Sequence, residues 1–457
     1  MSLFAFSGSG RAVSRRVLFQ MAIIGFCTGL VKIAGAAKVV FSARAFGVGD
    51  DADAYFIAFL VIAFFGDTLA GSLLPALVPT FIEAREAEGR AAAERVYLSA
   101  MSCAVVLLSS VAMVLFVAAP WALRPFASHF DAPKLALTSS LFRWMLPMMP
   151  LAAIGTAWRA VLNTEERFAL PAMIPAATPL VSILFLLWFA NTWGVYALAA
   201  GSLVGAVLEV SLLGVMMWHR GFAIMPRWFG RTGSLDQLFT QYWPVVAGVW
   251  LIGGAPLIDQ SIAAMLGSGS VAALQYGTRL TVVLAAVGPG AVATAILPHF
   301  STLIATRDGG EIRRTLRSYA TIILAVTLPA IVVLMFISEP LARLFFQRGN
   351  FTGTATEVVA MVQRYALLQI PFAMLMALVV RLISSMKMNS LLPRAAVLAA
   401  AINLIASLVL IRWMGVAGIA LGSAIAQAAS LVYLVLLIRT RLPASFHSSP
   451  RTEVAAR

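Results

Sequence analysis

Twelve long apolar runs constrain this chain more than any other feature of its sequence. They cover approximately residues 18–43, 54–82, 97–122, 137–161, 168–191, 194–218, 238–266, 271–303, 316–340, 356–384, 391–411 and 415–438. Each run reaches or exceeds the roughly 20 residues that an α-helix needs to cross a bilayer. Runs that are continuous rather than alternating favour helices over the strands of a membrane barrel. The sequence therefore predicts an all-α polytopic membrane protein with about 12 transmembrane helices, the first of which is retained as an anchor.

The composition of the chain excludes several classes of function. Charged residues make up 11% of the sequence, against roughly 25% in soluble domains. The formal charge of +14 comes mainly from Lys and Arg in alternate loops, which reflects membrane topology rather than nucleic-acid binding. Cys27 and Cys103 lie in apolar runs and the four histidines are scattered, so we predict neither a disulfide nor a zinc site. The absence of a phosphate-binding loop, an HExxH motif or a partnered nucleophile argues against an enzyme.

The basic residues also predict the orientation of the chain. With the N-terminus in the cytoplasm, the segments on the inner side hold 22 Lys and Arg residues, and those on the outer side hold 6. Cytoplasmic loops of membrane proteins carry such an excess. We therefore predict that both termini are cytoplasmic, and that the protein is a multi-pass protein of a bacterial cytoplasmic (inner) membrane.

The second half of the sequence repeats the first at a nearly constant offset. The matched features are LVPTF (77–81) with ILPHF (296–300), Arg143 with Arg364, Arg159 with Arg381, Leu170-Pro171 with Leu392-Pro393, and Gly194-Val195 and Gly201-Ser202 with Gly415-Val416 and Gly422-Ser423. Because each half has an even number of spans, the two halves run in the same direction, as in transporters with parallel repeats. We predict a six-helix half over residues 1–218, an interfacial cytoplasmic linker over 219–237, a second six-helix half over 238–440, a cytoplasmic tail over 441–457, and a central cavity between the halves.

Cations inside the apolar runs point to an anionic ligand. Lys32 and Lys38 lie within the first run, where a lysine costs about 2.5–3.5 kcal/mol on insertion scales. Arg279 supplies a third cation from the second half. Arg143 and Arg364 stand near the outer ends of spans, where they either contact the ligand or snorkel to the interface. Together these residues predict a site for an anionic headgroup such as a diphosphate.

Acidic residues inside the spans suggest two further roles. Asp53, Asp67 and Glu209 are candidate gating residues, although Asp53 also suits the start of a helix. Asp259, with Asn403 and Ser407 spaced four residues apart on one helix face, is a candidate site for a hard monovalent cation such as Na⁺. The alternative for Asp259 is an intramembrane ion pair with a basic residue. Without a nucleotide site, transport energy would come from an ion gradient, the membrane potential or the substrate gradient.

The chain resembles the MurJ/MviN lipid II flippases of the MOP exporter superfamily. The stretches that carry the resemblance are ARAFGVGDDADAYFIAF (43–59), GSLLPALVPTFIEAREAEG (71–89), SGSVAALQYGTRL (268–280), ILPHFS (296–301) and LFFQRGNFT (344–352). The resemblance implies an alternating-access flippase with a cationic central cavity. It places Lys32, Lys38 and Arg279 on essential arginines of that family, and Asp53 on its acidic residue at the start of span 2. It likens the group of Asp259, Asn403 and Ser407 to a sodium site.

The chain departs from the family pattern at several positions. Gly66 stands where the family has an arginine in span 2, and Gly71 stands where it has a glutamate. The two lysines of the first span keep the charge of the family's arginines but lose the planar guanidinium. Members commonly have fourteen spans, and this chain has twelve predicted ones. These departures keep a flippase for an exopolysaccharide or another lipid-linked oligosaccharide as an alternative.

The resulting prediction is a flippase for an undecaprenyl-diphosphate-linked peptidoglycan precursor. A cation-coupled multidrug antiporter of the same superfamily, relying on Asp67, Glu209 and Asp259, is a second alternative, and a non-transporting scaffold for glycan synthesis is a third. The predicted partners are the lipid-linked glycan, the bilayer and glycan-synthesis proteins, with no nucleic acid. No cofactor is predicted apart from coupling to Na⁺ or to the membrane potential.

Overall fold

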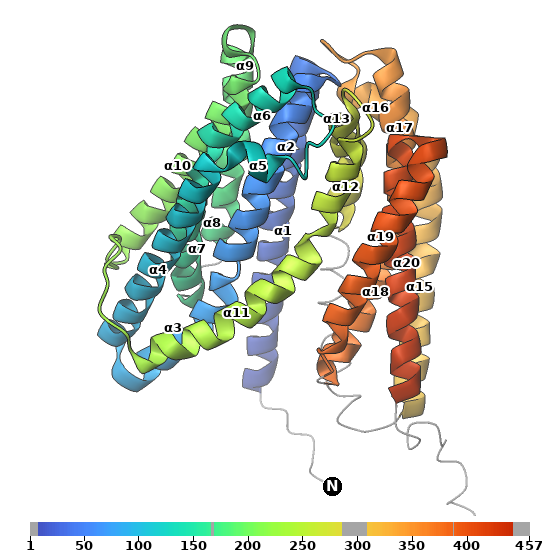
Figure 1. The fold of residues 1–457 in the computed structure, drawn as a ribbon. Helices are drawn as coiled ribbons and strands as arrows, with labels where there is room; N and C mark the ends of the chain where they lie inside the picture. Colours follow the sequence, from blue (N-terminus) through green and yellow to red (C-terminus); the bar gives the residue numbers. More distant parts are fainter. Residues whose placement is uncertain (1–7, 166–168, 286–308, 387, 442–457) are drawn as a thin grey trace, which may run out of the picture. The chain divides into compact units, whose positions relative to one another are not determined.

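The computed structural model describes residues 8–165, 169–285, 309–386 and 388–441 (Figure 1). Regular secondary structure within these ranges is entirely helical and includes no β-strand. A helix satisfies its backbone hydrogen bonds internally, as a segment surrounded by lipid must. The predicted all-α membrane fold is therefore confirmed for the described part of the chain.

Eleven helical segments of the described residues are long and apolar enough to cross a membrane. They are Gly25–Phe46, Asp50–Glu88, Arg90–Val117, Ala132–Thr164, Leu170–Trp193, Tyr196–His219, Gly233–Ala263, Arg314–Phe336, Gly353–Ser385, Leu391–Met414 and Val416–Ile438. Each corresponds to one predicted span, with ends that differ by a few residues. The one remaining predicted span, 271–303, lies outside the described residues from residue 286 onward. The motif at 296–300 and the tail from residue 442 also lie outside them.

Contacts divide the chain into two compact units, Met1–Gly253 and Gly254–Arg457. The first contains α1 (Gly8–Phe46), α2 (Asp50–Phe65), the π-helix η1 (Gly66–Ala70), α3 (Leu73–Glu88), α4 (Arg90–Val117), α5 (Ala119–Leu123), α6 (Ala132–Met145), α7 (Met148–Thr164), α8 (Ala169–Met173), the 3₁₀-helix η2 (Ile174–Ala176), α9 (Ala177–Trp193), α10 (Tyr196–His219) and α11 (Gly233–Gly253). The second contains α12 (Ala255–Ala263), α13 (Ser270–Gly277), α15 (Gly309–Phe336), α16 (Ser338–Phe346), α17 (Gly353–Leu367), α18 (Gln369–Ser385), α19 (Leu391–Met414) and α20 (Val416–Arg441).

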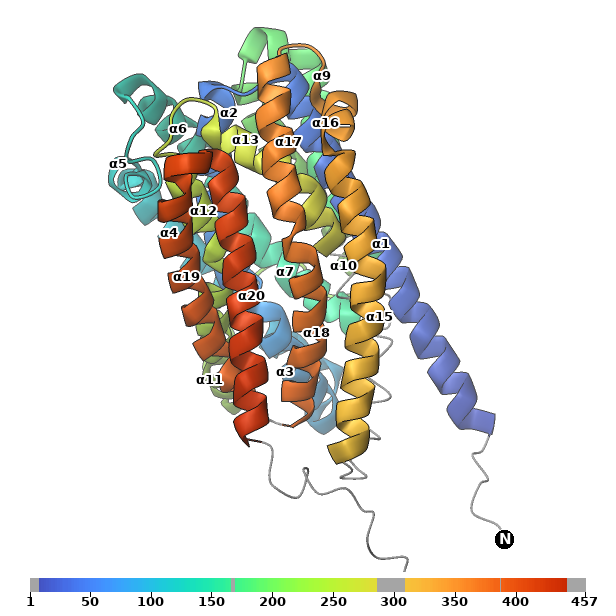
Figure 2. The same cartoon turned by 90° about the vertical axis from the view of Figure 1, so that its right-hand side faces the viewer.

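Each unit packs its helices in the same pattern. In the first unit α9 packs against α10, α2 against α6, and α7 against α10. In the second unit the corresponding pairs are α19 with α20, α13 with α17, and α18 with α20. Figures 1 and 2 show α19 and α20 side by side from two directions. The sequence repeat is therefore also a repeat of helix packing.

Local backbone features fix the register of this repeat. The side chain of Asp131 caps α6 by accepting from the backbone of Lys134, and Thr352 caps α17 in the same way by accepting from the backbone of Ala355. Gly194 ends α9 with φ 54° and ψ −139°, and Gly415 ends α19 with φ 55° and ψ −138°. Only glycine adopts this conformation readily. The step from Asp131 to Thr352 equals the step from Gly194 to Gly415, so one offset aligns positions of the two units one by one.

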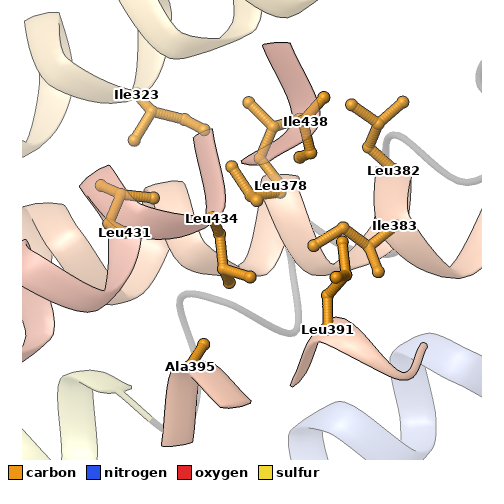
Figure 3. Packing of buried hydrophobic residues seen from close by; sticks show 10 residues of the cluster. Ile323, Leu378, Leu382, Ile383, Leu391, Ala395, Leu431, Leu434 and Ile438 are labelled. Carbon is orange, nitrogen blue, oxygen red and sulfur yellow. The ribbon is translucent and has the colours of Figure 1, made fainter. Parts of the chain in front are cut away.

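The core of the second unit is formed by side chains from four helices. Figure 3 shows Ile323 of α15 facing residues of α18, α19 and α20, including Leu378, Leu391 and Leu434. All four side chains are at least 90% buried. Such close packing is what holds helices together inside a membrane, where lipid removes the hydrophobic drive for association. This core holds α19 and α20 in place for the polar residues described below.

The linker predicted over residues 219–237 follows α10 and is bound to α4. Arg90 donates to the carbonyl oxygens of Arg220 and Gly221 at 2.7 and 3.1 Å, and its guanidinium lies over the ring of the buried Phe222. Beyond these contacts Trp228 is exposed. The linker continues into α11, which packs on α3, so the contact boundary between the units falls at Gly253 rather than inside the linker.

Candidate functional site

Lys38 lies at the centre of a buried hydrogen-bond network in the first unit. Its Nζ atom donates to the hydroxyl of Tyr55 on α2 at 2.9 Å and lies 4.5 Å from the ring centre of Phe59. The Tyr55 hydroxyl is 2.9 Å from Oγ of Ser202 on α10, which is 3.2 Å from Oγ of Ser182 on α9. These residues form the Lys38 network. It joins α1, α2, α9 and α10 through one ammonium group that is satisfied by a hydroxyl and an aromatic face.

Lys32, six residues earlier on α1, lies on a different face of the helix because six residues correspond to about 1.7 turns. Its ammonium is half-buried and lies within electrostatic reach of Asp67. Asp67 also interacts electrostatically with Arg159 on α7. The two lysines of the first span therefore have separate surroundings within the same unit.

Arg159 and Glu209 form an ion pair between α7 and α10. Arg159 donates through Nη1 to Oε1 of Glu209 at 2.6 Å and through Nη2 to Oγ1 of Thr156 at 3.0 Å. Thr178 of α9 donates to the second carboxylate oxygen of Glu209 at 3.1 Å. The guanidinium of Arg159 thus binds the candidate gating residue Glu209.

Asp67 lies in the π-helical turn η1, which interrupts the second span. Its side chain is exposed. A Cβ atom on Gly71 would collide with the backbone carbonyl oxygen of Asp67. The π-turn therefore requires glycine at a position where the related family has a glutamate. Such turns often occur at functional sites because they insert one residue and re-aim the side chains around it.

Asp53 is fully buried at the start of α2 and pairs with Lys134 of α6. The Lys134 ammonium lies 2.7 Å from Asp53 Oδ2 and 2.7 Å from Oδ1 of the more exposed Asp50. The ring of Phe130 lies 4.1 Å from the same ammonium. Lys134 itself is only 7% exposed. The candidate gating residue Asp53 thus has a specific cationic partner.

The predicted cation ligands Asp259, Asn403 and Ser407 come together in the second unit. Asn403 of α19 donates to Asp259 Oδ1 of α12 at 2.7 Å, and Ser407 donates to Asn403 Oδ1 at 3.3 Å. Ser423 of α20 donates to Asp259 Oδ2 at 2.8 Å and is 3.2 Å from Asn403 Oδ1. These four residues form the Asp259 cluster. Among the described residues, the partners of the Asp259 carboxylate are the amide of Asn403 and the hydroxyl of Ser423 rather than a basic side chain.

The remaining predicted cations occupy three different settings. Arg143 of α6 donates from Nε to the carbonyl oxygen of Phe116 near the end of α4 at 3.2 Å. Arg364 of α17 lies 3.5 Å from Glu339 of α16. Arg143 thus connects α6 to the last turn of α4, and Arg364 connects α17 to the first turn of α16. Arg279 lies just after the end of α13. The buried Nε atom of its guanidinium has no hydrogen-bond partner within the described ranges.

Several residues that contact the candidate site residues carry no signal of their own in the sequence. Tyr55 and Lys134 supply the partners of Lys38 and Asp53, but they lie 17 and 81 residues away along the chain. In the sequence, Ser423 stands out only as part of the repeated pair Gly422-Ser423. The repeat register contains the missing signal for Ser423, because it aligns that serine with Ser202 of the Lys38 network.

These features define a multi-pass helical membrane protein built from an internal repeat, with polar sites inside each unit. A family model described as "Lipid II flippase MurJ" matches residues 42–456. The chain therefore belongs to the lipid II flippase MurJ family.

Relatives of the same description match the chain, and solved structures share its fold. "Lipid II flippase MurJ" of Burkholderia cenocepacia is 27% identical over 350 residues, which cover 74% of this chain and 67% of the relative. "Probable lipid II flippase MurJ" of Rhizobium tropici is 27% identical over 434 residues, covering 92% and 80%. A structure of lipid II flippase MurJ in an inward closed conformation aligns with a TM-score of 0.80 at 20% identity, covering 93% and 89%. An inward-facing multidrug resistance MATE transporter of the MOP superfamily shares the fold, with a TM-score of 0.74 at 14% identity and coverage of 94% and 99%.

Proposed function

We propose that this chain moves lipid II, an undecaprenyl-diphosphate-linked peptidoglycan precursor, across the bacterial cytoplasmic membrane. The family match over residues 42–456 is the observation that carries the proposal. It is supported by relatives of the same description in Burkholderia cenocepacia and Rhizobium tropici. The chain then acts as an alternating-access transporter rather than an enzyme, with both termini in the cytoplasm.

Lys32 and Arg279 are the cations best suited to contact the diphosphate. Lys32 makes no hydrogen bond or close ion pair with any residue that the structure describes. The buried Nε atom of Arg279 has no partner there either. A buried donor without an acceptor costs roughly 1–3 kcal/mol, which a phosphate oxygen would offset. In this proposal Asp67 balances the charge of Lys32 between transport events.

The other predicted residues have supporting roles in this proposal. Arg143 and Arg364 lie in the last turns of α6 and α17, where they hold neighbouring helices together. Asp53 and Glu209 act within ion pairs, so their movement would require those pairs to open. The multidrug antiporter alternative relies on Asp67, Glu209 and Asp259. Of these carboxylates Glu209 is engaged by Arg159, which counts against its exchanging a cation.

The Asp259 cluster suits coupling to a monovalent cation such as Na⁺. One carboxylate, one amide oxygen and two hydroxyls converge from α12, α19 and α20. Hard cations prefer such oxygen ligands. The described residues contain no group of three His, Cys, Asp or Glu side chains that would suit a divalent metal. A bound monovalent cation would neutralise Asp259, and the residues that hold it would draw α19 and α20 toward α12.

Complementation tests the proposed substrate. A bacterial strain depleted of its own lipid II flippase is expected to grow when this chain is expressed, and growth should fail with Lys32→Ala or Arg279→Ala. Arg231→Ala is the matched control, because Arg231 is an exposed arginine of the linker, 79% accessible, and pairs only with Asp236 among the described residues. Membrane levels of every variant are measured by quantitative blotting.

The outcomes separate the candidate functions. Absence of growth despite normal membrane levels would contradict lipid II transport and would favour another lipid-linked glycan, such as an exopolysaccharide precursor. A scaffold that does not transport, or a multidrug antiporter, would likewise fail to restore growth. Growth that survives both substitutions would overturn the proposed contact of Lys32 and Arg279 with the diphosphate.

A further inference from the structure

The register of the repeat aligns the two polar sites of the molecule residue by residue. The same offset that relates Gly194 to Gly415 relates Lys38 to Asp259. Ser182 and Ser202 correspond in the same way to Asn403 and Ser423. This register is the one fixed independently by the matching helix caps and glycine conformations. The alignment therefore does not depend on the polar residues themselves.

The hydrogen bonds join equivalent helices in both units, although the route to the charged residue differs. Ser202 Oγ lies 3.2 Å from Ser182, and Ser423 Oγ lies 3.2 Å from the amide oxygen of Asn403. Ser202 reaches the charged residue of its unit, Lys38, through the hydroxyl of Tyr55, while Ser423 donates directly to Asp259. In the first unit a charged side chain on α1 is thus linked to neutral side chains on α9 and α10. In the second unit a charged side chain on α12 is linked to the equivalent positions on α19 and α20.

The two sites differ in the sign of their charge. The Lys38 ammonium is 9% exposed and meets a hydroxyl and an aromatic face, both of which attract cations. The position of Phe59 is taken by Leu280 in the second unit. The aromatic wall is therefore present only in the unit that already contains a cation.

We propose that the Lys38 ammonium is a built-in cation of the N-terminal half, at the position where the C-terminal half presents Asp259 to an exchangeable cation. The second part of this statement rests on the cation coupling proposed above. A lysine reaches about as far from its backbone as an aspartate together with a bound ion. The helices joined by the Lys38 network in the N-terminal half are consequently held together whether or not ions are present. Only the C-terminal half responds to ions. Lys38 then acts as a positioning residue rather than as a contact of the diphosphate.

Hydrogen–deuterium exchange of the full chain in lipid nanodiscs tests this role, in NaCl and in choline chloride of equal ionic strength. In the wild type, Na⁺ should slow exchange in α19 and α20 and leave α9 and α10 unchanged. Lys38→Met should speed exchange in α2 and α10 by about tenfold in either salt, because a hydrogen bond to a charged group is lost. Lys38→Arg, which keeps the charge, should restore most of the protection.

Exchanging the charge in the second unit gives the complementary test. Asp259→Lys should protect α19 and α20 without Na⁺, whereas Asp259→Asn should leave them unprotected in both salts. The proposal is refuted if Lys38→Met leaves exchange in α2 and α10 unchanged. It is equally refuted if a folded Asp259→Lys exchanges as fast as Asp259→Asn. Should Asp259→Lys not fold, the comparison of Lys38→Met with Lys38→Arg decides alone.

The same data separate this inference from the proposed coupling. Suppose that Na⁺ does not change hydrogen exchange in α19 and α20 of the wild type, while Lys38→Met and Asp259→Lys have their expected effects. That result would overturn sodium coupling and support the built-in cation. Loss of growth complementation would overturn the substrate assignment, and exchange in α2 and α10 does not depend on the substrate.

Discussion

The ion pair between Lys134 and Asp53 gives a stringent test of how the first unit is held together. Lys134 is 7% exposed and its ammonium contacts two carboxylates at 2.7 Å, one from Asp53, which is fully buried, and one from Asp50, which is 54% exposed. The three residues join α2 to α6. Because the carboxylates differ in burial, the three single substitutions should differ in cost.

The expected costs follow from what each substitution leaves behind. Lys134→Met leaves the buried Asp53 carboxylate without its ammonium, and removing one partner of a buried pair costs about 3–5 kcal/mol. Asp53→Asn leaves Lys134 paired with Asp50, so we expect about 1–3 kcal/mol, the cost of weakening a hydrogen bond to a charged group. Asp50→Asn removes an exposed partner and should cost ~1 kcal/mol or less. The double variant with Lys134→Met and Asp53→Asn should be more stable than Lys134→Met alone.

Equilibrium unfolding in mixed micelles of a mild detergent and SDS measures these differences. Tryptophan fluorescence reports the transition, and the free energy of unfolding of each variant is compared with that of the wild type. The double-mutant cycle isolates the energy that couples Lys134 to Asp53. Equal costs for Lys134→Met and Asp50→Asn, or strictly additive effects of Lys134→Met and Asp53→Asn, would refute the buried ion pair.

Two further predictions address the repeat and the linker. Gly415→Ala should lower the free energy of unfolding by about 1–3 kcal/mol because its φ of 55° strains any other residue. Gly248→Ala, in an open position of α11, should be neutral, so equal effects of the two changes would contradict the argument. Arg90→Ala removes both bonds to the linker carbonyls and should speed hydrogen exchange at residues 220–223 by about tenfold. Unchanged exchange there would show that the linker is held by other contacts.

Hydropathy alone predicted the helical framework because its cause is local. A segment in lipid must satisfy its own backbone and present apolar side chains, and both requirements can be read within some 20 consecutive residues. The interruptions were not predictable in this way. The π-turn at Gly66–Ala70 and the break between α11 and α12 at Gly254 lie inside apolar runs. Hydropathy does not distinguish a continuous helix from an interrupted one.

The candidate site was predicted only where its residues carry their own signal. Lys32, Lys38 and Asp259 stand out because a charge in an apolar run is costly. Their partners are ordinary hydroxyl and amide residues that cost little in a helix, so nothing in the local sequence marks Tyr55 or Ser182 as functional. The burial of Lys134 was not predictable for a related reason, because a lysine at the end of an apolar run indicates topology whether or not its side chain is buried.

The repeat register carries information that neither hydropathy nor motif matching uses. Two copies of one unit impose the same contacts on equivalent positions, so a polar pair seen in one copy predicts the location of its counterpart in the other. Asn403 and Ser423 point in this way to Ser182 and Ser202, although two serines among apolar residues attract no attention by themselves. Lys38 and Asp259 occupy equivalent positions of the repeat but carry opposite charges. Such positions are where we expect the two halves to differ in function.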